Sequence, residues 1–215
     1  MNRFQTLSVI AALAGAGAAR AASVDVSYTR ITSNSGQNVE SQFITTVTEV
    51  AGDPTVIDFI FRNNVGIASS ISEVYFDNGA TSSLFSGGAI AQQVGASFVF
   101  GSASPPDLPG GNSLADPFDV TPGFLADAQG NPSVGLNTAS DLLRIRMTLL
   151  AGVTFGDVES ALGTGALRLG MHVRAIGDDG ESDSFVNGPP PIVPLPGGGA
   201  MGLAALTILA SRRRR

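Results

Sequence analysis

Cysteine, lysine and tryptophan are absent from this chain of 215 residues, and it has a single histidine. Without cysteine, the chain forms no disulfide, thiolate metal site, cysteine nucleophile or redox dithiol. Because His172 stands alone, a histidine cluster for zinc or iron is excluded, and a Ser-His-Asp triad would depend on this one residue. The sequence has no Gly-x-Ser-x-Gly segment, so we expect His172 to be an ordinary exposed or hydrogen-bonded strand residue.

Positive charge is also scarce, and half of it lies at the two ends. All twelve basic residues are arginine, and six of them are Arg3, Arg20, Arg212, Arg213, Arg214 and Arg215. The segment between them has six arginines against eighteen acids, which gives a net charge near −12. Nucleic-acid binding draws its affinity from clustered cations, so we expect no nucleic acid as a partner.

The first 21 residues have the order of a cleavable secretory signal peptide. Arg3 supplies a positive start, a short apolar stretch rich in alanine and leucine follows, and Ala19 and Ala21 form a small-x-small cleavage site. The apolar stretch is shorter than a membrane span requires. We therefore expect cleavage after Ala21; a retained anchor or a buried helix is the alternative.

The last residues combine three features in a fixed order. A proline-rich linker at 188–192 precedes the segment 193–215, which begins Val193-Pro194-Leu195-Pro196-Gly197, continues through apolar residues and ends in four arginines. The prolines break a helix, and the arginines remain on the cytoplasmic side by the positive-inside rule. We expect this segment to hold the chain in the membrane after export, with Arg212, Arg213, Arg214 and Arg215 as its basic stop.

This tail resembles the PEP-CTERM class of bacterial sorting signals in its Val-Pro-Leu-Pro variant, with Leu195 where the family name expects glutamate. The resemblance implies a membrane-embedded sorting protease of the exosortase type as a partner, and export alongside exopolysaccharide. The glycines at 197–199 are also typical of tails handled by rhomboid-like sorting proteases, so the class of processing enzyme stays open. A plain anchor that is never cut is a further alternative.

Residues 22–187 are expected to form one all-β domain. Short strand patterns are separated by clusters of Gly, Asn, Pro and Ser, and the clearest cover 143–149 and 167–174. In both, apolar residues alternate with polar ones, which is typical of half-buried strands with one face toward water. The expected architecture is an antiparallel β-sandwich, jelly-roll-like or Ig-like, with one short helical connection.

Three local signals refine this architecture. Thr154 is expected to cap the helix, in which Phe155, Val158 and Leu162 share a face and which Gly163 ends. Asn78-Gly79 predicts a hairpin turn after the strand over 71–77. The proline-rich segment 102–122 is expected to be a stiff loop whose apolar residues attach it to the core, namely Leu108, Leu114 and Phe118.

Parts of the central domain resemble an uncharacterised domain found on proteins with this kind of tail. The segments that carry the resemblance are Phe59 to Asn64, Ser69 to Asp77, Ser104 to Gly110 and Leu167 to Val173. The resemblance implies an extracellular location and no particular activity.

The acids allow two kinds of chemistry. Glu73 and Asp77 flank Tyr75 and are the best candidates for a pair of glycosidase carboxylates, although a solvated strand face gives the same pattern. Asp178, Asp179, Glu181 and Asp183 surround a glycine-containing turn and could supply oxygen ligands to Ca²⁺. The spacing is not that of an EF-hand, and a solvated acidic turn is the alternative. No other cofactor is expected.

Four arginines are the remaining candidates for a binding site. Arg144, Arg146, Arg168 and Arg174 lie on the polar faces of the two clearest strands, so they would form a basic strip if those strands shared a sheet. Such a strip would suit the carboxylates of an acidic exopolysaccharide. Cross-strand ion pairs with the protein's own acids are the alternative.

Together these features predict a non-enzymatic protein of the cell surface or extracellular matrix. The two alternatives are a secreted carbohydrate-active hydrolase, which needs two carboxylates in a cleft, and a plain membrane-tethered periplasmic protein.

Overall fold

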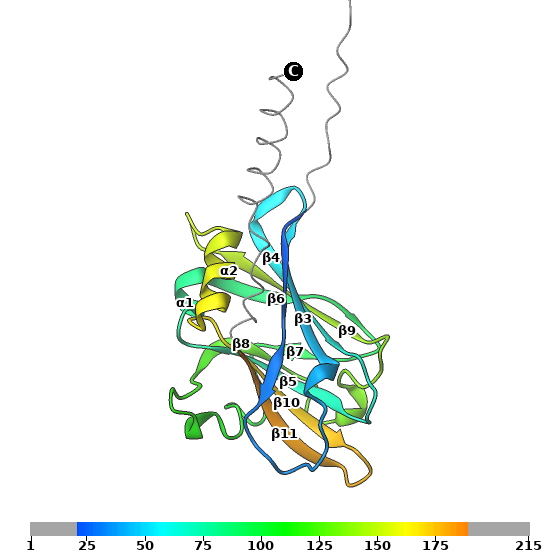
Figure 1. Cartoon of the computed structure of the whole chain (residues 1–215). Helices are drawn as coiled ribbons and strands as arrows, with labels where there is room; N and C mark the ends of the chain where they lie inside the picture. Colours follow the sequence, from blue (N-terminus) through cyan, green and yellow to red (C-terminus); the bar gives the residue numbers. More distant parts are fainter. Residues whose placement is uncertain (1–20, 189–215) are drawn as a thin grey trace, which may run out of the picture.

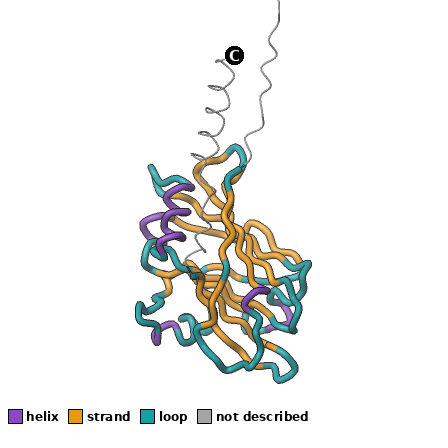
Figure 2. The backbone as a smooth tube through the Cα atoms, viewed as in Figure 1, coloured by secondary structure: helices purple, strands orange, loops and turns teal. Residues whose placement is uncertain are grey.

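The structure, a computed structural model, describes residues 21–188 as two antiparallel sheets packed face to face (Figures 1 and 2). One sheet has five strands in the order β1-β3-β4-β9-β6, and the other has six in the order β2-β11-β10-β5-β8-β7. The strands are β1 Ser23–Val26, β2 Tyr28–Arg30, β3 Phe43–Val50, β4 Asp53–Asn63, β5 Ser70–Asp77, β6 Phe85–Val94, β7 Val99–Phe100, β8 Val120–Asp127, β9 Leu142–Leu149, β10 Leu169–Ile176 and β11 Glu181–Asn187. The prediction of an all-β sandwich is confirmed.

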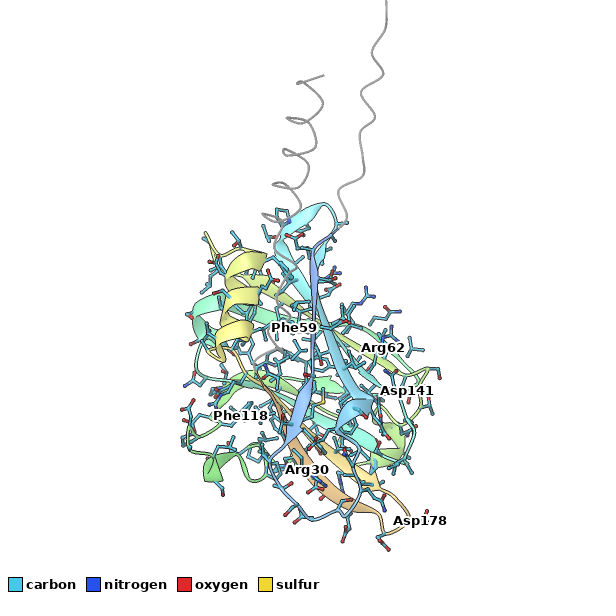
Figure 3. The ribbon with its side chains drawn as sticks, in the orientation of Figure 1. Arg30, Phe59, Arg62, Phe118, Asp141 and Asp178 are labelled. Carbon is cyan, nitrogen blue, oxygen red and sulfur yellow. The ribbon has the colours of Figure 1, made fainter. Side chains whose placement is uncertain are left out.

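Aromatic side chains fill the space between the sheets. Phe59 of β4, which is labelled in Figure 3, is fully buried. It meets Phe76 of β5 edge to face, with ring centroids 5.2 Å apart. Phe43 of β3 and Phe185 of β11 make a second such pair at 4.9 Å. Each pair joins one sheet to the other, so the alternation of apolar residues along the strands becomes a single interior.

The start of the domain belongs to both sheets. β1 pairs with β3 in the five-stranded sheet, and after Ser27 alone the chain continues as β2, which pairs with β11 in the six-stranded sheet (Figure 1). The residues before and after Ser27 therefore bridge the two layers along one side of the sandwich.

The helix α2, Phe155–Thr164, begins as the sequence predicts. Thr154 and Asp157 form a reciprocal capping box, and Phe155, Val158 and Leu162 are its buried residues. The helix ends two residues later than expected, because Gly165 rather than Gly163 adopts the left-handed conformation that terminates it. A second helix, α1 Thr81–Leu84, and three 3₁₀ turns, Glu40–Gln42, Gly111–Ser113 and Pro132–Val134, were not expected.

The hairpin predicted at Asn78-Gly79 is wrong. β5 and β6, which flank it, lie in different sheets, and the chain crosses between them through α1. The carboxylate of Asp77 accepts a hydrogen bond from the Asn78 backbone N–H, and its carbonyl accepts one from Thr81 Oγ1. A Cβ at Gly79 would come 2.6 Å from the carbonyl oxygen of Ala166, so the glycine is required for close packing.

The loop 101–119, between β7 and β8, covers the outer face of the six-stranded sheet. Leu108 and Phe118 are each 2 % exposed and pack with Tyr75 in a second, smaller apolar cluster. Leu114 is partly buried against the same cluster. The sequence therefore identified the residues that attach this loop, but they contact the outer face of the sheet and not the main core.

Candidate functional site

The four arginines expected to form a basic strip are divided between the two sheets. Arg144 and Arg146 lie on β9 of the five-stranded sheet, whereas Arg174 lies on β10 of the six-stranded sheet and Arg168 directly precedes that strand. The strip required both strands in one sheet, so the structure does not bring the four side chains together. Each arginine instead has its own contacts within the domain.

Arg144 and Arg146 share one buried acid. Asp58 on β4 is opposite Arg146 in the strand register and is 3 % exposed. Its two carboxylate oxygens accept hydrogen bonds from Nε and Nη2 of Arg146 at 2.7 and 2.9 Å, and Nη1 of Arg144 lies 3.6 Å away. The hydrogen bonds to Asp58 raise the pKa of Arg146. This is the cross-strand ion pair that the sequence offered as the alternative to the strip.

Arg168 fastens the loop 101–119 to the sheet. Its Nε donates to the Asp77 carboxylate at 2.6 Å, and its Nη1 donates to the carbonyl of Asp116 at 2.8 Å. The guanidinium also lies over the Phe118 ring, 5.4 Å from its centroid. Asp77 also accepts the backbone N–H of Asp119, so one carboxylate and one guanidinium together hold the end of the loop that leads into β8.

The remaining strip arginine, Arg174, is partly buried like the other three. Nη1 of Arg174 donates to the carbonyl of Gly130 at 2.8 Å, which ties β10 to the turn after β8.

The acids of the proposed calcium turn point in different directions. Asp178 and Asp179 are exposed in the turn between β10 and β11, and Asp178 is at its tip (Figure 3). Asp183 is 1 % exposed and faces the 32–35 segment, where it accepts hydrogen bonds from Thr32 Oγ1 and from the backbone N–H groups of residues 34 and 35, at 2.8 to 3.0 Å. Within residues 21–188 no group of three or more His, Cys, Asp or Glu side chains could hold a metal ion. The expected set of Asp178, Asp179, Glu181 and Asp183 is therefore not assembled.

A row of polar residues crosses the outer face of the six-stranded sheet. In register from strand to strand lie Ser184 of β11, His172 of β10, Glu73 of β5 and Asp127 of β8, which we call the polar row. Ser184 and Glu73 are fully buried, Asp127 is 7 % exposed, and the His172 side chain is 13 % exposed. Local sequence patterns did not predict this row, because each member is a single polar residue in an ordinary strand pattern and the row depends on strand order.

His172 and Glu73 form the centre of the polar row. Nδ1 of His172 lies 2.8 Å from Oε2 of Glu73, yet the ring N–H is not aimed along a regular hydrogen bond, and neither carboxylate oxygen of Glu73 has a hydrogen-bond partner. The hydroxyl of Ser184 is also unpartnered. Buried polar groups are almost always satisfied, so this centre is an unusual feature of the fold.

Two carboxylates of the polar row are neighbours, but both are buried and neither is open to solvent. Glu73 and Asp127 are opposite each other on adjacent strands, where Cβ atoms lie about 5 Å apart. Asp127 accepts the backbone N–H groups of Ser104 and Gly130, which closes the loop 101–119 over it. Burial, and next the charge of Glu73, raise the pKa of Tyr75, whose hydroxyl donates to the carbonyl of Pro105. The pair suggested by the sequence, Glu73 and Asp77, lies four residues apart on the extended strand β5, which is about 13 Å at about 3.3 Å per residue, and Asp77 is bound to Arg168.

The predicted targeting segments lie outside the described residues. These are Ala19 of the cleavage site, the sorting motif at 193–197 and Arg212 to Arg215; Ala21 is the first residue described. In the described part of the chain no helix is long and apolar enough to cross a membrane. Comparisons of the chain with protein-family models, with curated proteins and with solved structures each gave no match.

Proposed function

We propose that this chain is an exported protein of the cell surface or extracellular matrix, whose β-sandwich has a binding or structural role and whose tail directs its sorting. The observation that carries the proposal is the order of features in residues 193–215: a Pro-Leu-Pro-Gly break, a short apolar segment and four terminal arginines. Together with the N-terminal leader, this order fits a chain that crosses the membrane and is stopped at its last residues.

The tail works through a balance of transfer energies. The apolar segment favours the bilayer but is shorter than a comfortable span, and each arginine at the membrane centre costs about 3 kcal/mol on insertion scales. Four consecutive arginines therefore resist translocation and keep the preceding motif at the outer surface of the membrane. A membrane-embedded protease of the exosortase or rhomboid-like type would meet the motif there, and the chain would then be released or transferred.

A non-enzymatic role is supported by the contacts of the charged residues in the described domain, several of which bind other parts of the same domain. Arg146 and Arg168 are committed to Asp58 and Asp77, and Asp183 is committed to the 32–35 segment. These contacts stiffen a domain that has no cysteine with which to form disulfides. The four-arginine strip and the calcium turn have no part in this role, because the structure does not bring their residues together.

Two alternatives use the same export route. For a carbohydrate-active hydrolase, the adjacent carboxylates of Glu73 and Asp127 would have to reach substrate, and both are covered by neighbouring structure. A plain membrane-tethered periplasmic protein would differ from the proposed sorted protein only in that its C-terminal tail is never cut.

Fractionation of native cells followed by intact-mass measurement tests the proposal. We expect a surface or extracellular species that begins at Ala22 and ends near Gly197. Replacing Arg212, Arg213, Arg214 and Arg215 by serine should abolish sorting and change the C-terminal mass, while Arg62→Ser with Arg174→Ser, which removes charge from the domain, should leave both unchanged. An uncut chain in the cytosol would refute the proposal; an exported chain with its tail intact would favour the simple anchor.

A further inference from the structure

Half of the arginines in the described domain lie on one face of the five-stranded sheet. Arg62 of β4, labelled in Figure 3, and Arg144 and Arg146 of β9 alternate with core residues, so their side chains lie on the outer face. In the strand register Arg146 is opposite Asp58. Arg144 is opposite Ile60, so Arg62 lies diagonally across from it. We call these three arginines and the strand surface around them the arginine face.

The three arginines share one carboxylate. Arg146 holds Asp58 with two hydrogen bonds, and Arg144 lies 3.6 Å from it, whereas Arg62 has no ion pair within residues 21–188. Nε of Arg144 is buried without a hydrogen-bond partner. The other acids on strands of this sheet bind threonine or backbone groups, namely Asp25, Glu49 and Asp53. The arginine face therefore has an excess of positive charge.

This excess is an exception in an acidic domain. The described chain has eighteen acids against six arginines, and two arginines elsewhere are well paired. Arg30 lies 3.5 Å from Asp183, and Arg168 donates to Asp77. Polar groups without partners in a folded protein mark places where a requirement other than stability operates. The free guanidinium groups are therefore available to an anion from outside the chain.

We propose that the arginine face binds the carboxylates of a uronic-acid polymer. Asp58 shows the kind of ligand that suits these side chains, because its carboxylate accepts from both Nε and Nη2 of Arg146 in the paired geometry. Nucleic acid is disfavoured, because three cations on a domain of net charge near −12 supply little attraction for phosphate. The ligand is therefore carboxylated, and it approaches the domain at this face.

The surroundings of the arginines favour a sugar over a protein partner. Protein interfaces are anchored by exposed aromatic residues that become buried on binding. The aromatic residues of β3, β4, β6 and β9 all belong to the core instead, namely Phe43, Phe59, Phe61 and Phe85. Beside Arg146, the small residues Gly87, Ala89 and Ala91 line an open hollow of about 560 Å³, a volume within the usual range for ligand pockets. Sugar rings would occupy this hollow while their carboxylates meet the guanidinium groups.

The expected binding depends on many weak contacts. An exposed ion pair contributes little by itself, so a single uronate should bind weakly. A polymer offers carboxylates at regular intervals, and many copies of the domain on one surface bind it with a combined strength that one copy lacks. The inference deepens the proposed function, and rests on it, because display at the cell surface is what brings the copies together.

Binding of the purified full chain, in detergent, to immobilised polygalacturonate tests the proposal. Arg62→Gln with Arg144→Gln leaves the contact between Arg146 and Asp58 in place and should weaken binding by roughly tenfold, since two exposed ion pairs are lost. Arg174→Gln with Ser160→Glu changes the net charge by the same amount away from the arginine face. This matched control should bind like the natural chain. Raising the salt concentration should release the natural chain from the polymer.

Filling the hollow provides a second measurement, which removes no charge. Ala89→Phe should weaken binding to polygalacturonate, whereas Ala51→Phe, in the exposed turn between β3 and β4, should not. Polyglutamate has carboxylates without sugar rings, so the natural chain should bind it less tightly than polygalacturonate.

Three outcomes would overturn the inference: unchanged binding by the glutamine variant, an equal loss in its matched control, or equal binding of the two polymers by the natural chain. Failure of the proposed function looks different. Cell fractionation would then find the chain uncut in the cytosol, whatever the purified protein binds.

Discussion

Nδ1 of His172 lies 2.8 Å from Oε2 of Glu73, and Glu73 is fully enclosed between β10 and β8. No hydrogen bond satisfies either oxygen of this carboxylate, so His172 is the neighbour on which it depends. Removing one member of a buried polar pair leaves the other without a partner, which is the costly case for a buried polar group.

We therefore expect His172→Ala to lower the free energy of unfolding by about 3 kcal/mol. Adding Glu73→Leu to that variant should recover part of the loss, because no polar side chain is then left buried without a partner. Urea unfolding of the single and double variants measures both effects. A double variant no more stable than His172→Ala would contradict the assigned dependence of Glu73 on His172.

The two tyrosines of the chain predict its response to alkali. Burial raises the pKa of Tyr28, whose hydroxyl shares a hydrogen bond with Thr45, and burial with the charge of Glu73 raises that of Tyr75. Each folded-state pKa exceeds the unfolded value of about 10, so the stability from each is complete below that pH and is lost as pH rises above it.

Tyrosinate absorbance should therefore appear together with the loss of circular dichroism, and not before it, as the pH is raised past about 10. Tyr28→Phe should reduce the steepness of the alkaline loss and cost about 1 kcal/mol at neutral pH for the hydrogen bond with Thr45. Ionisation of both tyrosines in the folded protein at a pH near the ordinary tyrosine pKa would contradict the burial of their side chains.

Asp58 is expected to matter more than either arginine that it binds. Asp58→Asn should destabilise the domain by about 2 kcal/mol, because the bidentate contact with Arg146 is lost and two guanidinium groups are left side by side. Arg146→Lys keeps the charge but not the paired geometry and should cost less. If Asp58→Asn unfolds at the same urea concentration as the natural protein, the contact contributes nothing.

Arg168 should control the loop 101–119. Arg168→Ala removes the contacts with Asp77, Asp116 and Phe118, so we expect a loss of about 3 kcal/mol and rapid cleavage within the loop by a protease specific for apolar residues. Arg174→Ala, which loses one contact to a carbonyl, is the matched control and should leave the loop resistant. Equal cleavage of both variants would show that the apolar residues alone hold the loop.

Local patterns predicted much of this fold. The alternation along β9, the Thr154 cap of α2, and the attachment of the loop by Leu108 and Phe118 are all interactions that a few neighbouring residues determine. The predictions that failed concern contacts between residues that are far apart in the sequence. β9 and β10 have the same pattern, and nothing within either strand indicates that they join different sheets.

The same limit applies to the candidate sites. Asp183 belongs by sequence to an acidic turn, but the residues that bind its carboxylate lie about 150 positions earlier, at Thr32 and Asn34. Glu73 and His172 are paired only because β5 and β10 are neighbours. The sequence shows that these residues are polar. It does not show their partners, because the partners depend on the order of strands in the sheet, which local propensity does not determine.

The pairing of β2 with β11 has a consequence for the export that we propose. Tyr28 to Arg30, close to the N-terminal end of the domain, align with Phe185 to Asn187, close to its C-terminal end. The six-stranded sheet cannot be completed while its final strand is still inside a ribosome or a translocation channel. Contacts of such long range also form slowly. If the chain is exported as we propose, this order would keep it open enough to pass through a narrow pore, and the sheet would close only after the last strand had emerged.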